Sequence, residues 1–223
     1  MYRMEDGAAM NTEEILQCID HTLLRPTATL DEVRALCEEG ISLKTASICI
    51  PPCYVWQINN EFKKQIPVCT VIGFPLGYNS SMIKFKEVEK ALSDGADELD
   101  IVINIGDVKS GDYDKVLDEI TGIKYSAEEK IVKVIIETCY LTREEKIKMC
   151  EIVSASGADY IKTSTGLGSL GAVLEDIQLF KEHLDPSIKI KAAGGIKTRE
   201  DMIRFIEAGC SRIGTSSAKV LVQ

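Results

Sequence analysis

The stretch Ser156-Gly157-Ala158-Asp159-Tyr160-Ile161-Lys162-Thr163-Ser164-Thr165-Gly166 contains the end of a helix, a short apolar strand and a hydroxyl-rich turn in direct succession. Its first glycine suits the position after a helix where φ is positive. The same junction recurs at Asp94-Gly95-Ala96-Asp97 and at Ala208-Gly209-Cys210-Ser211. Three closely similar passages from helix to strand indicate a repeated βα unit.

Apolar and amphipathic runs alternate in the same way along the rest of the chain. They predict eight strands, each followed by a helix except the last, and a short N-terminal helix at 12–17. This order fits an α/β fold, a single (β/α)8 TIM barrel. A doubly wound sheet is the alternative, but the glycine-rich turn that it needs after the first strand is missing. The expected strands are 18–21, 45–50, 68–72, 98–103, 131–137, 159–162, 188–192 and 212–214, and the other helices are 30–39, 52–62, 83–94, 113–125, 142–156, 171–183 and 198–208.

The chain is predicted to form one domain over 12–223, because no linker or low-complexity segment interrupts it. Residues 1–11 are expected to be a tail that is disordered or foreign to the natural protein. Thr12, Thr142 and Thr198 precede amphipathic runs and are the expected N-caps of their helices. A glutamate three residues after Thr142 completes a capping box at that position.

Composition restricts the classes of function. The 223 residues carry a net charge of −9 and no basic run, which argues against a nucleic-acid partner. No segment has the apolar length of a membrane span, and residues 1–11 lack the apolar core of a signal peptide. None of the eight cysteines forms a CxxC pair and the chain has two histidines, so we expect no metal site. We expect a cytoplasmic protein whose thiols are reduced and buried.

Charged residues lie at the strand ends where a barrel places its active site. Lys162 ends the strand of the opening stretch, and Lys191 lies at the end of the expected strand 188–192, just before a glycine turn. Asp100 lies in the expected strand 98–103 and Asp20 in the expected strand 18–21. A desolvated lysine beside an anion site is suited to Schiff-base chemistry. For either lysine alone, a side chain that reaches solvent from a strand end is the structural alternative. Several such charges on separate apolar strands favour a catalytic site.

The loops after the last two expected strands predict a phosphate site, since barrels commonly bind phosphate there. They offer glycines and hydroxyl groups close to helix N-termini. The turn at Gly166 adds further backbone N–H groups, and Cys49 ends a strand as a candidate pocket residue. The expected partner is a small phosphorylated compound. The candidate substrate-binding residues are Cys49, Gly166, Gly194, Gly195, Gly214, Ser216 and Ser217.

Taken in order, these motifs resemble the deoxyribose-phosphate aldolases, class I enzymes that interconvert 2-deoxy-D-ribose 5-phosphate with acetaldehyde and D-glyceraldehyde 3-phosphate. The similarity extends from Ile15 to Val220. It rests on Ile19-Asp20-His21-Thr22-Leu23-Leu24, Cys69-Thr70-Val71-Ile72-Gly73-Phe74-Pro75-Leu76-Gly77, Glu98-Leu99-Asp100-Ile101-Val102-Ile103-Asn104, Val134-Ile135-Ile136-Glu137-Thr138, Ile161-Lys162-Thr163-Ser164-Thr165-Gly166 and Lys191-Ala192-Ala193-Gly194-Gly195-Ile196.

The resemblance implies roles for individual residues. Lys162 would form the Schiff base, Lys191 would favour loss of its proton and join the proton relay, and Asp100 would be the acid–base partner. Asp20 and Thr22 match family residues near the substrate. The resemblance implies that no metal or cofactor takes part.

The chain departs from the family pattern at two places. Leu170-Gly171-Ala172-Val173 stands where the family usually has Gly-Gly-Ala-Thr, which puts the shape of that loop in question. The last residues, Leu221-Val222-Gln223, give no match for the functional C-terminal tyrosine of some members.

Three other functions share parts of this pattern. A different Schiff-base aldolase would use Lys162 on another sugar phosphate. A metal-free sugar-phosphate isomerase would use Asp100 or Glu137 as its base. A non-catalytic barrel would bind phosphate without turnover. A homodimer is compatible with the sequence, which does not fix the oligomeric state.

Overall fold

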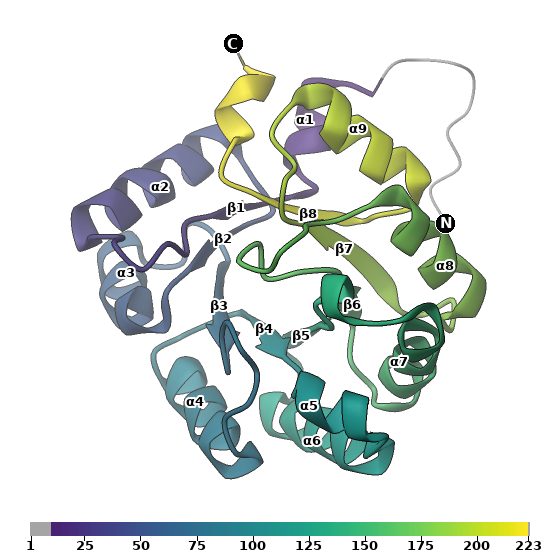
Figure 1. Ribbon diagram of the computed structural model, residues 1–223. Helices are drawn as coiled ribbons and strands as arrows, with labels where there is room; N and C mark the ends of the chain where they lie inside the picture. Colours follow the sequence, from purple (N-terminus) through teal and green to yellow (C-terminus); the bar gives the residue numbers. More distant parts are fainter. Residues whose placement is uncertain (1–9, 223) are drawn as a thin grey trace.

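Eight parallel strands pair in chain order, and β8 pairs with β1 to close a barrel (Figure 1). The computed structural model describes residues 10–222. The closed barrel confirms the predicted fold class and excludes the doubly wound sheet, in which two edge strands would stay unpaired. The strands are β1 Ile19–Thr22, β2 Ser47–Ile50, β3 Val68–Ile72, β4 Glu98–Val102, β5 Ile131–Ile135, β6 Tyr160–Lys162, β7 Lys189–Ala193 and β8 Arg212–Thr215.

The helices surround the strands on the outside, as Figure 1 shows in a view along the barrel. Among the described residues, no helix has both the length and the apolarity needed to cross a membrane. The α-helices are α1 Thr12–Leu16, α2 Leu30–Leu43, α3 Val55–Phe62, α4 Ser81–Ser93, α5 Ile105–Ser110, α6 Tyr113–Ala127, α7 Arg143–Ala155, α8 Leu174–His183 and α9 Arg199–Ala208, and the 3-10 helices are η1 Pro52–Tyr54, η2 Thr138–Tyr140 and η3 Ala218–Leu221.

Capping residues set the start of several helices. The predicted N-caps Thr142 and Thr198 are confirmed, each within a capping box. At α1 the prediction is wrong by one residue, because Asn11 caps the helix and forms the capping box with Glu14. Of the predicted tail, residues 1–9 lie outside the described part of the chain. The carbonyl of Met10 accepts a hydrogen bond from the guanidinium of Arg199 at 3.2 Å, so the start of the described chain is tied to α9.

Each expected helix differs from the structure by at least one residue at an end, and the shifts at α2 and α8 have local reasons. α2 continues four residues beyond the expected end because Gly40 lets it approach the sheet: a Cβ there would lie 2.8 Å from Cγ2 of Ile48. α8 begins three residues later than expected. The backbone N–H of Ala172 donates to the carbonyls of Ala193 and Gly194, both at 3.1 Å, so residues 171–173 lie against the loop after β7 and do not enter the helix.

Packing between barrel and helices uses the side chains that point away from the barrel interior. Leu99 and Ile101 flank Asp100 in β4 and are buried in the main apolar core, because side chains alternate along a strand. Each fully buried aliphatic side chain contributes roughly 1.5–3 kcal/mol. One ion pair interrupts this layer: Lys84 on α4 contacts Glu119 on α6 at 2.6 Å, and both are buried.

The cysteines are free, and five of them are buried as expected, namely Cys37, Cys49, Cys69, Cys150 and Cys210. The expectation fails for Cys53, which is exposed in η1. Cys18 and Cys139 are partly buried.

Candidate active site

The barrel interior holds a group of charged side chains that are buried or nearly so. Ser47 of β2 and Cys69 of β3 donate hydrogen bonds to its carboxylates at 2.8 and 3.1 Å, so all eight strands contribute a side chain. The charged cluster consists of Asp20 (β1), Glu98 and Asp100 (β4), Lys133 (β5), Lys162 (β6), Lys191 (β7) and Arg212 (β8).

Asp100 is the centre of the charged cluster. Its Oδ2 accepts hydrogen bonds from Lys162 and Lys191, both at 2.7 Å, and its Oδ1 accepts one from Lys133 at 2.9 Å. Burial opposes the charged form of Asp100, but the three ammonium groups outweigh it and hold the pKa of Asp100 well below its usual range. The predicted convergence of Asp100, Lys162 and Lys191 is therefore confirmed.

Lys162 and Lys191 are direct neighbours on adjacent strands. Their Cα atoms are partners in the register of β6 and β7, and their amino groups contact the same oxygen. Burial disfavours the charged form of Lys191, but Asp100 and Asp20 outweigh it and raise the pKa of Lys191. The Lys162 side chain keeps 3% of its exposure while Lys191 and Asp100 keep none, so Lys162 is the one most open to a small molecule.

Asp20 was expected to lie near the substrate, but it is fully buried within the charged cluster. It has no exposed surface, and its oxygens accept hydrogen bonds from Ser47 at 2.8 Å, from Lys191 and from Arg212. Thr22 is partly buried and donates to the carbonyl of Asp20 at 2.7 Å. The contacts of Asp20 and Thr22 with substrate stay predictions. The role that this structure gives to Asp20 is to hold Lys191.

Charge balance distinguishes Lys162 from the other cations. The charged cluster has four cations and three carboxylates, so it carries one surplus positive charge when every group is ionised. Lys133 makes three ion pairs and Lys191 two, whereas Lys162 makes one. Removing a proton from Lys162 therefore breaks the fewest ion pairs and leaves a neutral cluster. A neutral amine is the nucleophilic form of lysine.

The predicted phosphate loops meet above the ends of β6, β7 and β8. Gly166, Gly194 and Gly195 all have positive φ, between 80° and 88°. A Cβ on Gly194 would lie 2.9 Å from Cα of Gly171 and 3.3 Å from Cα of Gly166, so glycine is needed at this contact. The loop departure at 170–173 therefore keeps its glycine at the position where the two loops touch. A Cβ on Gly195 would meet no atom within 4 Å, which leaves open space beside an exposed turn.

The loop after β8 closes the same region. Gly214 is the register partner of Ala193 at the end of β7, and Thr215 donates to the carbonyl of Ile196 at 2.7 Å. Ser216 is exposed and Ser217 partly buried, so both hydroxyl groups are within reach of a ligand from solvent.

Ser164 is a further candidate that the sequence reasoning missed. It is fully buried, and its hydroxyl has no hydrogen-bond partner among the described residues. Its Cβ lies 3.6 Å from the position that a Cβ on Gly194 would occupy. Buried hydroxyl groups are almost always paired, so an unpaired one beside the glycine turn is suited to a substrate oxygen.

Glu137 follows β5 in a left-handed conformation with φ 48°, which is uncommon outside glycine. It accepts hydrogen bonds from the backbone N–H and the hydroxyl of Thr165, and thereby fixes the turn before Gly166. Burial raises the pKa of Glu137, although the hydrogen bonds from Thr165 oppose this. These contacts favour a role in shaping the turn over the role of isomerase base.

Lys133, Arg212 and Cys69 also belong to the site and were not predicted. Each lies within an expected strand, and each contacts a carboxylate of the charged cluster. The signal that could have found Lys133 is the one that found Asp100, a charged residue in the middle of the apolar run Ile131–Ile135. Parity along the strand would then have placed it inside the barrel.

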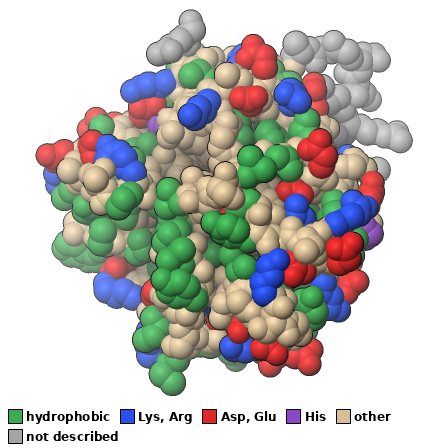
Figure 2. Space-filling model, viewed as in Figure 1, with side chains coloured by type: hydrophobic (Ala, Val, Ile, Leu, Met, Phe, Trp, Pro, Cys, Tyr) green, Lys and Arg blue, Asp and Glu red, His purple; other side chains and the backbone are tan. Residues whose placement is uncertain are grey.

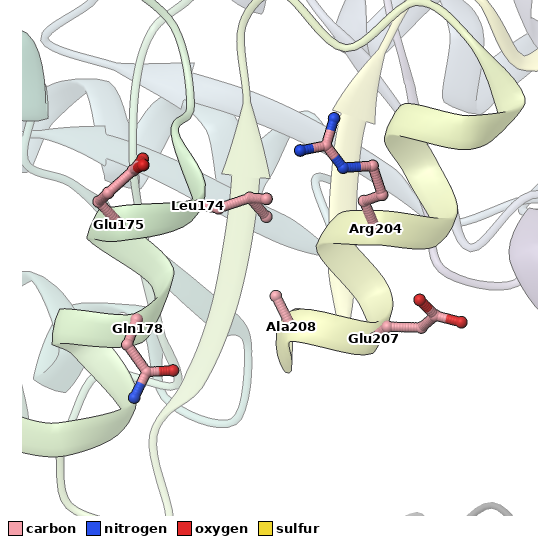
Figure 3. A pocket seen from close by; sticks show the side chains of 6 residues that line it. All are labelled: Leu174, Glu175, Gln178, Arg204, Glu207 and Ala208. Carbon is pink, nitrogen blue, oxygen red and sulfur yellow. The ribbon is translucent and has the colours of Figure 1, made fainter.

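Outside the barrel, a groove of about 530 Å³ runs between α8 and α9 (Figure 3). None of its residues belongs to the charged cluster, and its two carboxylates do not favour an anionic ligand. We therefore do not place the active site there. The groove is lined by Leu174, Glu175, Gln178, Arg204, Glu207 and Ala208.

Comparison with known proteins agrees with this geometry. The sequence model of the DeoC/LacD family of aldolases matches residues 14–218. The chain belongs to this family. A deoxyribose-phosphate aldolase of Clostridium botulinum (strain Alaska E43 / Type E3) is 57% identical over 214 residues, which cover 96% of this chain and 97% of that protein.

Two solved structures of aldolases have a similar fold. The aldolase QR15 has a TM-score of 0.88 and 42% identity, with 92% of each chain covered. The deoxyribose phosphate aldolase of Aeropyrum pernix, described as a unique tetramer, has a TM-score of 0.87 and 32% identity over 95% of this chain and 91% of that one.

Proposed function

We propose that this member of the DeoC/LacD family cleaves 2-deoxy-D-ribose 5-phosphate reversibly to acetaldehyde and D-glyceraldehyde 3-phosphate. The observation that carries the proposal is the position of Lys162, whose single ion pair to Asp100 makes it the surplus cation beside Lys191. The name of the Clostridium botulinum relative, at 57% identity, supports this substrate. Release of both aldehydes from the sugar phosphate is the direct test.

Neutral Lys162 attacks the aldehyde carbon of the open-chain sugar phosphate, and loss of water gives an iminium ion. Removal of the proton from the hydroxyl on the third carbon lets the bond between the second and third carbons break. Its electron pair passes to the iminium, which becomes an enamine of acetaldehyde as glyceraldehyde 3-phosphate leaves. Protonation of the enamine carbon and hydrolysis then release acetaldehyde and restore Lys162.

Asp100 and Lys191 are the proposed groups for these proton transfers. Asp100 is held as a carboxylate by its lysines, so it acts as the acceptor. Lys191 is held as an ammonium by Asp100 and Asp20, so it acts as the donor and keeps Lys162 next to a positive charge. No residue outside the charged cluster is needed for these steps.

The phosphate is proposed to bind at the loops after β6, β7 and β8. Backbone N–H groups around Gly166, Gly194 and Gly195 and the hydroxyl groups of Ser216 and Ser217 are its donors. The open space beside Gly195 and the unpaired hydroxyl of Ser164 support this location.

We expect Ser216→Asp to lower kcat/KM for 2-deoxyribose 5-phosphate by about 100-fold, because a carboxylate beside the phosphate costs several kcal/mol. Unphosphorylated 2-deoxyribose reacts slowly, since remote binding energy is missing, and its kcat/KM should hardly change in the variant. The measurement compares both sugars in both proteins.

Ser211→Asp is the matched control for this substitution, because Ser211 is an exposed serine just before the opposite end of β8. It should leave both sugars unaffected. A preference for the phosphorylated sugar that survives Ser216→Asp would show that the phosphate binds elsewhere.

A homodimer is proposed as the assembly. Large apolar side chains are exposed on α3, on the loop after β3 and on α4, and Figure 2 shows hydrophobic side chains gathered over this side. They are Trp56, Leu76, Tyr78, Met82 and Ile83. The eight free cysteines support a cytoplasmic location.

We expect Met82→Glu to convert the dimer to a monomer in sedimentation velocity, because it places a charge among these apolar side chains. Tyr125→Glu is the matched control, since Tyr125 is exposed on α6 and should leave the dimer intact. A wild-type protein that sediments as a monomer would rule out the dimer.

A further inference from the structure

Cys49 and Cys69 form a pair of thiols at the inner wall of the barrel. Their Cα atoms are register partners on β2 and β3, and both residues are fully buried. The two Sγ atoms and a carboxylate oxygen of Asp100 all lie within 4.8 Å of one another. Neighbouring strands are about 4.8 Å apart, and disulfides join Cα atoms separated by about 4.4–6.8 Å. A disulfide therefore fits between these strands without moving the backbone far.

The pair of thiols has charged neighbours on one side and apolar neighbours on the other. Cys69 donates to Oδ1 of Asp100 at 3.1 Å and lies 3.4 Å from Nζ of Lys133. On their other side the two thiols pack against Val71, with Leu24 and Phe74 partly buried over them. The pair thus lies between the charged cluster and an apolar wall.

We propose that Cys49 and Cys69 are a reversible oxidation site, at which a hydroperoxide converts the two thiols to a disulfide inside the barrel. Hydrogen peroxide is close to water in size, so it can enter wherever the small aldehyde product leaves.

The chemistry needs one hydroperoxide and no other reactant. The thiolate of Cys49 attacks a peroxide oxygen, and the O–O bond breaks to give a sulfenic acid and water once the leaving oxygen takes a proton. The sulfur of Cys69 then attacks the sulfur of Cys49, and the displaced hydroxide takes the proton of Cys69 as a second water. The two thiols together lose two protons and two electrons, and the peroxide is reduced to two waters.

The electrostatics favour Cys49 as the attacking thiol. The adjacent side chain of Cys69 lowers the pKa of Cys49 although burial opposes this, whereas burial raises the pKa of Cys69 well above its usual value. The Cβ atoms of paired parallel strands are about 4.8 Å apart, wider than the mean of about 3.8 Å in disulfides. The bond is therefore strained and readily reduced by small thiols.

Oxidation has a direct consequence for the proposed aldolase, and this part rests on the proposed function. A disulfide removes the S–H group with which Cys69 donates to Asp100. A hydrogen bond to a charged group is worth enough to change a rate by about tenfold or more, and we expect activity to fall by that factor. Reduction should restore it.

The experiment treats the folded enzyme with hydrogen peroxide, blocks free thiols with N-ethylmaleimide and maps peptides without reductant. We expect one linked peptide joining Cys49 to Cys69 and an intact mass lower by two hydrogens. Dithiothreitol should reverse both changes and restore activity. The exposed Cys53 provides the control, because Cys53→Ser should give the same linkage and the same loss of activity.

Two further variants identify the attacking thiol. In Cys69→Ser, dimedone should label Cys49 as a sulfenic acid, and in Cys49→Ser, Cys69 should stay unlabelled. Alkylation of both cysteines after peroxide treatment of the wild type, or a linkage to any other cysteine, overturns the proposal. The linked peptide is detected without turnover, so a lack of aldolase activity would count against the proposed function alone.

Discussion

Lys162→Arg is expected to reduce aldolase turnover by a factor on the order of 10⁶, the effect seen when a covalent nucleophile is deleted. Arginine keeps a positive charge next to Asp100, so the charged cluster stays paired. Its guanidinium cannot lose a proton at neutral pH and cannot condense with a carbonyl. The substitution is therefore expected to abolish Schiff-base formation while the protein still folds.

Borohydride reduction in the presence of acetaldehyde gives the direct measurement. The wild type should gain one two-carbon adduct, located on Lys162, and Lys162→Arg should gain none. Lys189→Arg is the matched control, because Lys189 is an exposed lysine at the other end of the neighbouring strand. An adduct mapped only to Lys191, or a wild type without an adduct, would contradict the assignment of the nucleophile.

Asp100→Asn is expected to lower kcat by about 100-fold or more, the usual contribution of a general acid–base group. The substitution removes the carboxylate that Lys133, Lys162 and Lys191 share. Because three ammonium groups then lose one of their counter-charges, we also expect the free energy of unfolding to fall by about 3–5 kcal/mol. Lys162 keeps its amine, so borohydride trapping of acetaldehyde should still label it.

Glu119→Gln separates these two effects. It breaks the buried pair with Lys84 between α4 and α6, outside the charged cluster, and should destabilise the fold by a similar amount. Its kcat should stay close to that of the wild type at a temperature where both variants are folded. If Asp100→Asn also keeps near-wild-type kcat, Asp100 has no part in the proton transfers.

Sequence reasoning predicted the barrel because its evidence is local and repeated. The junctions at Gly95, Gly157 and Gly209 each have positive φ, as expected for the residue that ends a helix. It failed at α2, which was expected to end just before Gly40 but continues through it to Leu43. That glycine serves a contact with Ile48 of β2, which only the packed structure reveals.

Some residues of the candidate site could likewise be found from local sequence, and others could not. Lys162, Lys191 and Asp100 could be found because a charged residue in an apolar strand is conspicuous and its strand position fixes which way it points. Lys133 carries the same signal and was overlooked. Arg212, Cys69 and Ser164 carry no such signal, because arginine, cysteine and serine are ordinary at strand ends and turns.

By itself, the sequence determined the order of strands and helices, the closed barrel as the best arrangement for them, and the two lysines and the aspartate at its centre. Only the tertiary structure decided which cation is surplus, because charge balance depends on how many carboxylates each amine contacts. It also brought Cys49 beside Cys69, since the register between strands 20 residues apart is set by barrel closure and not by any local pattern.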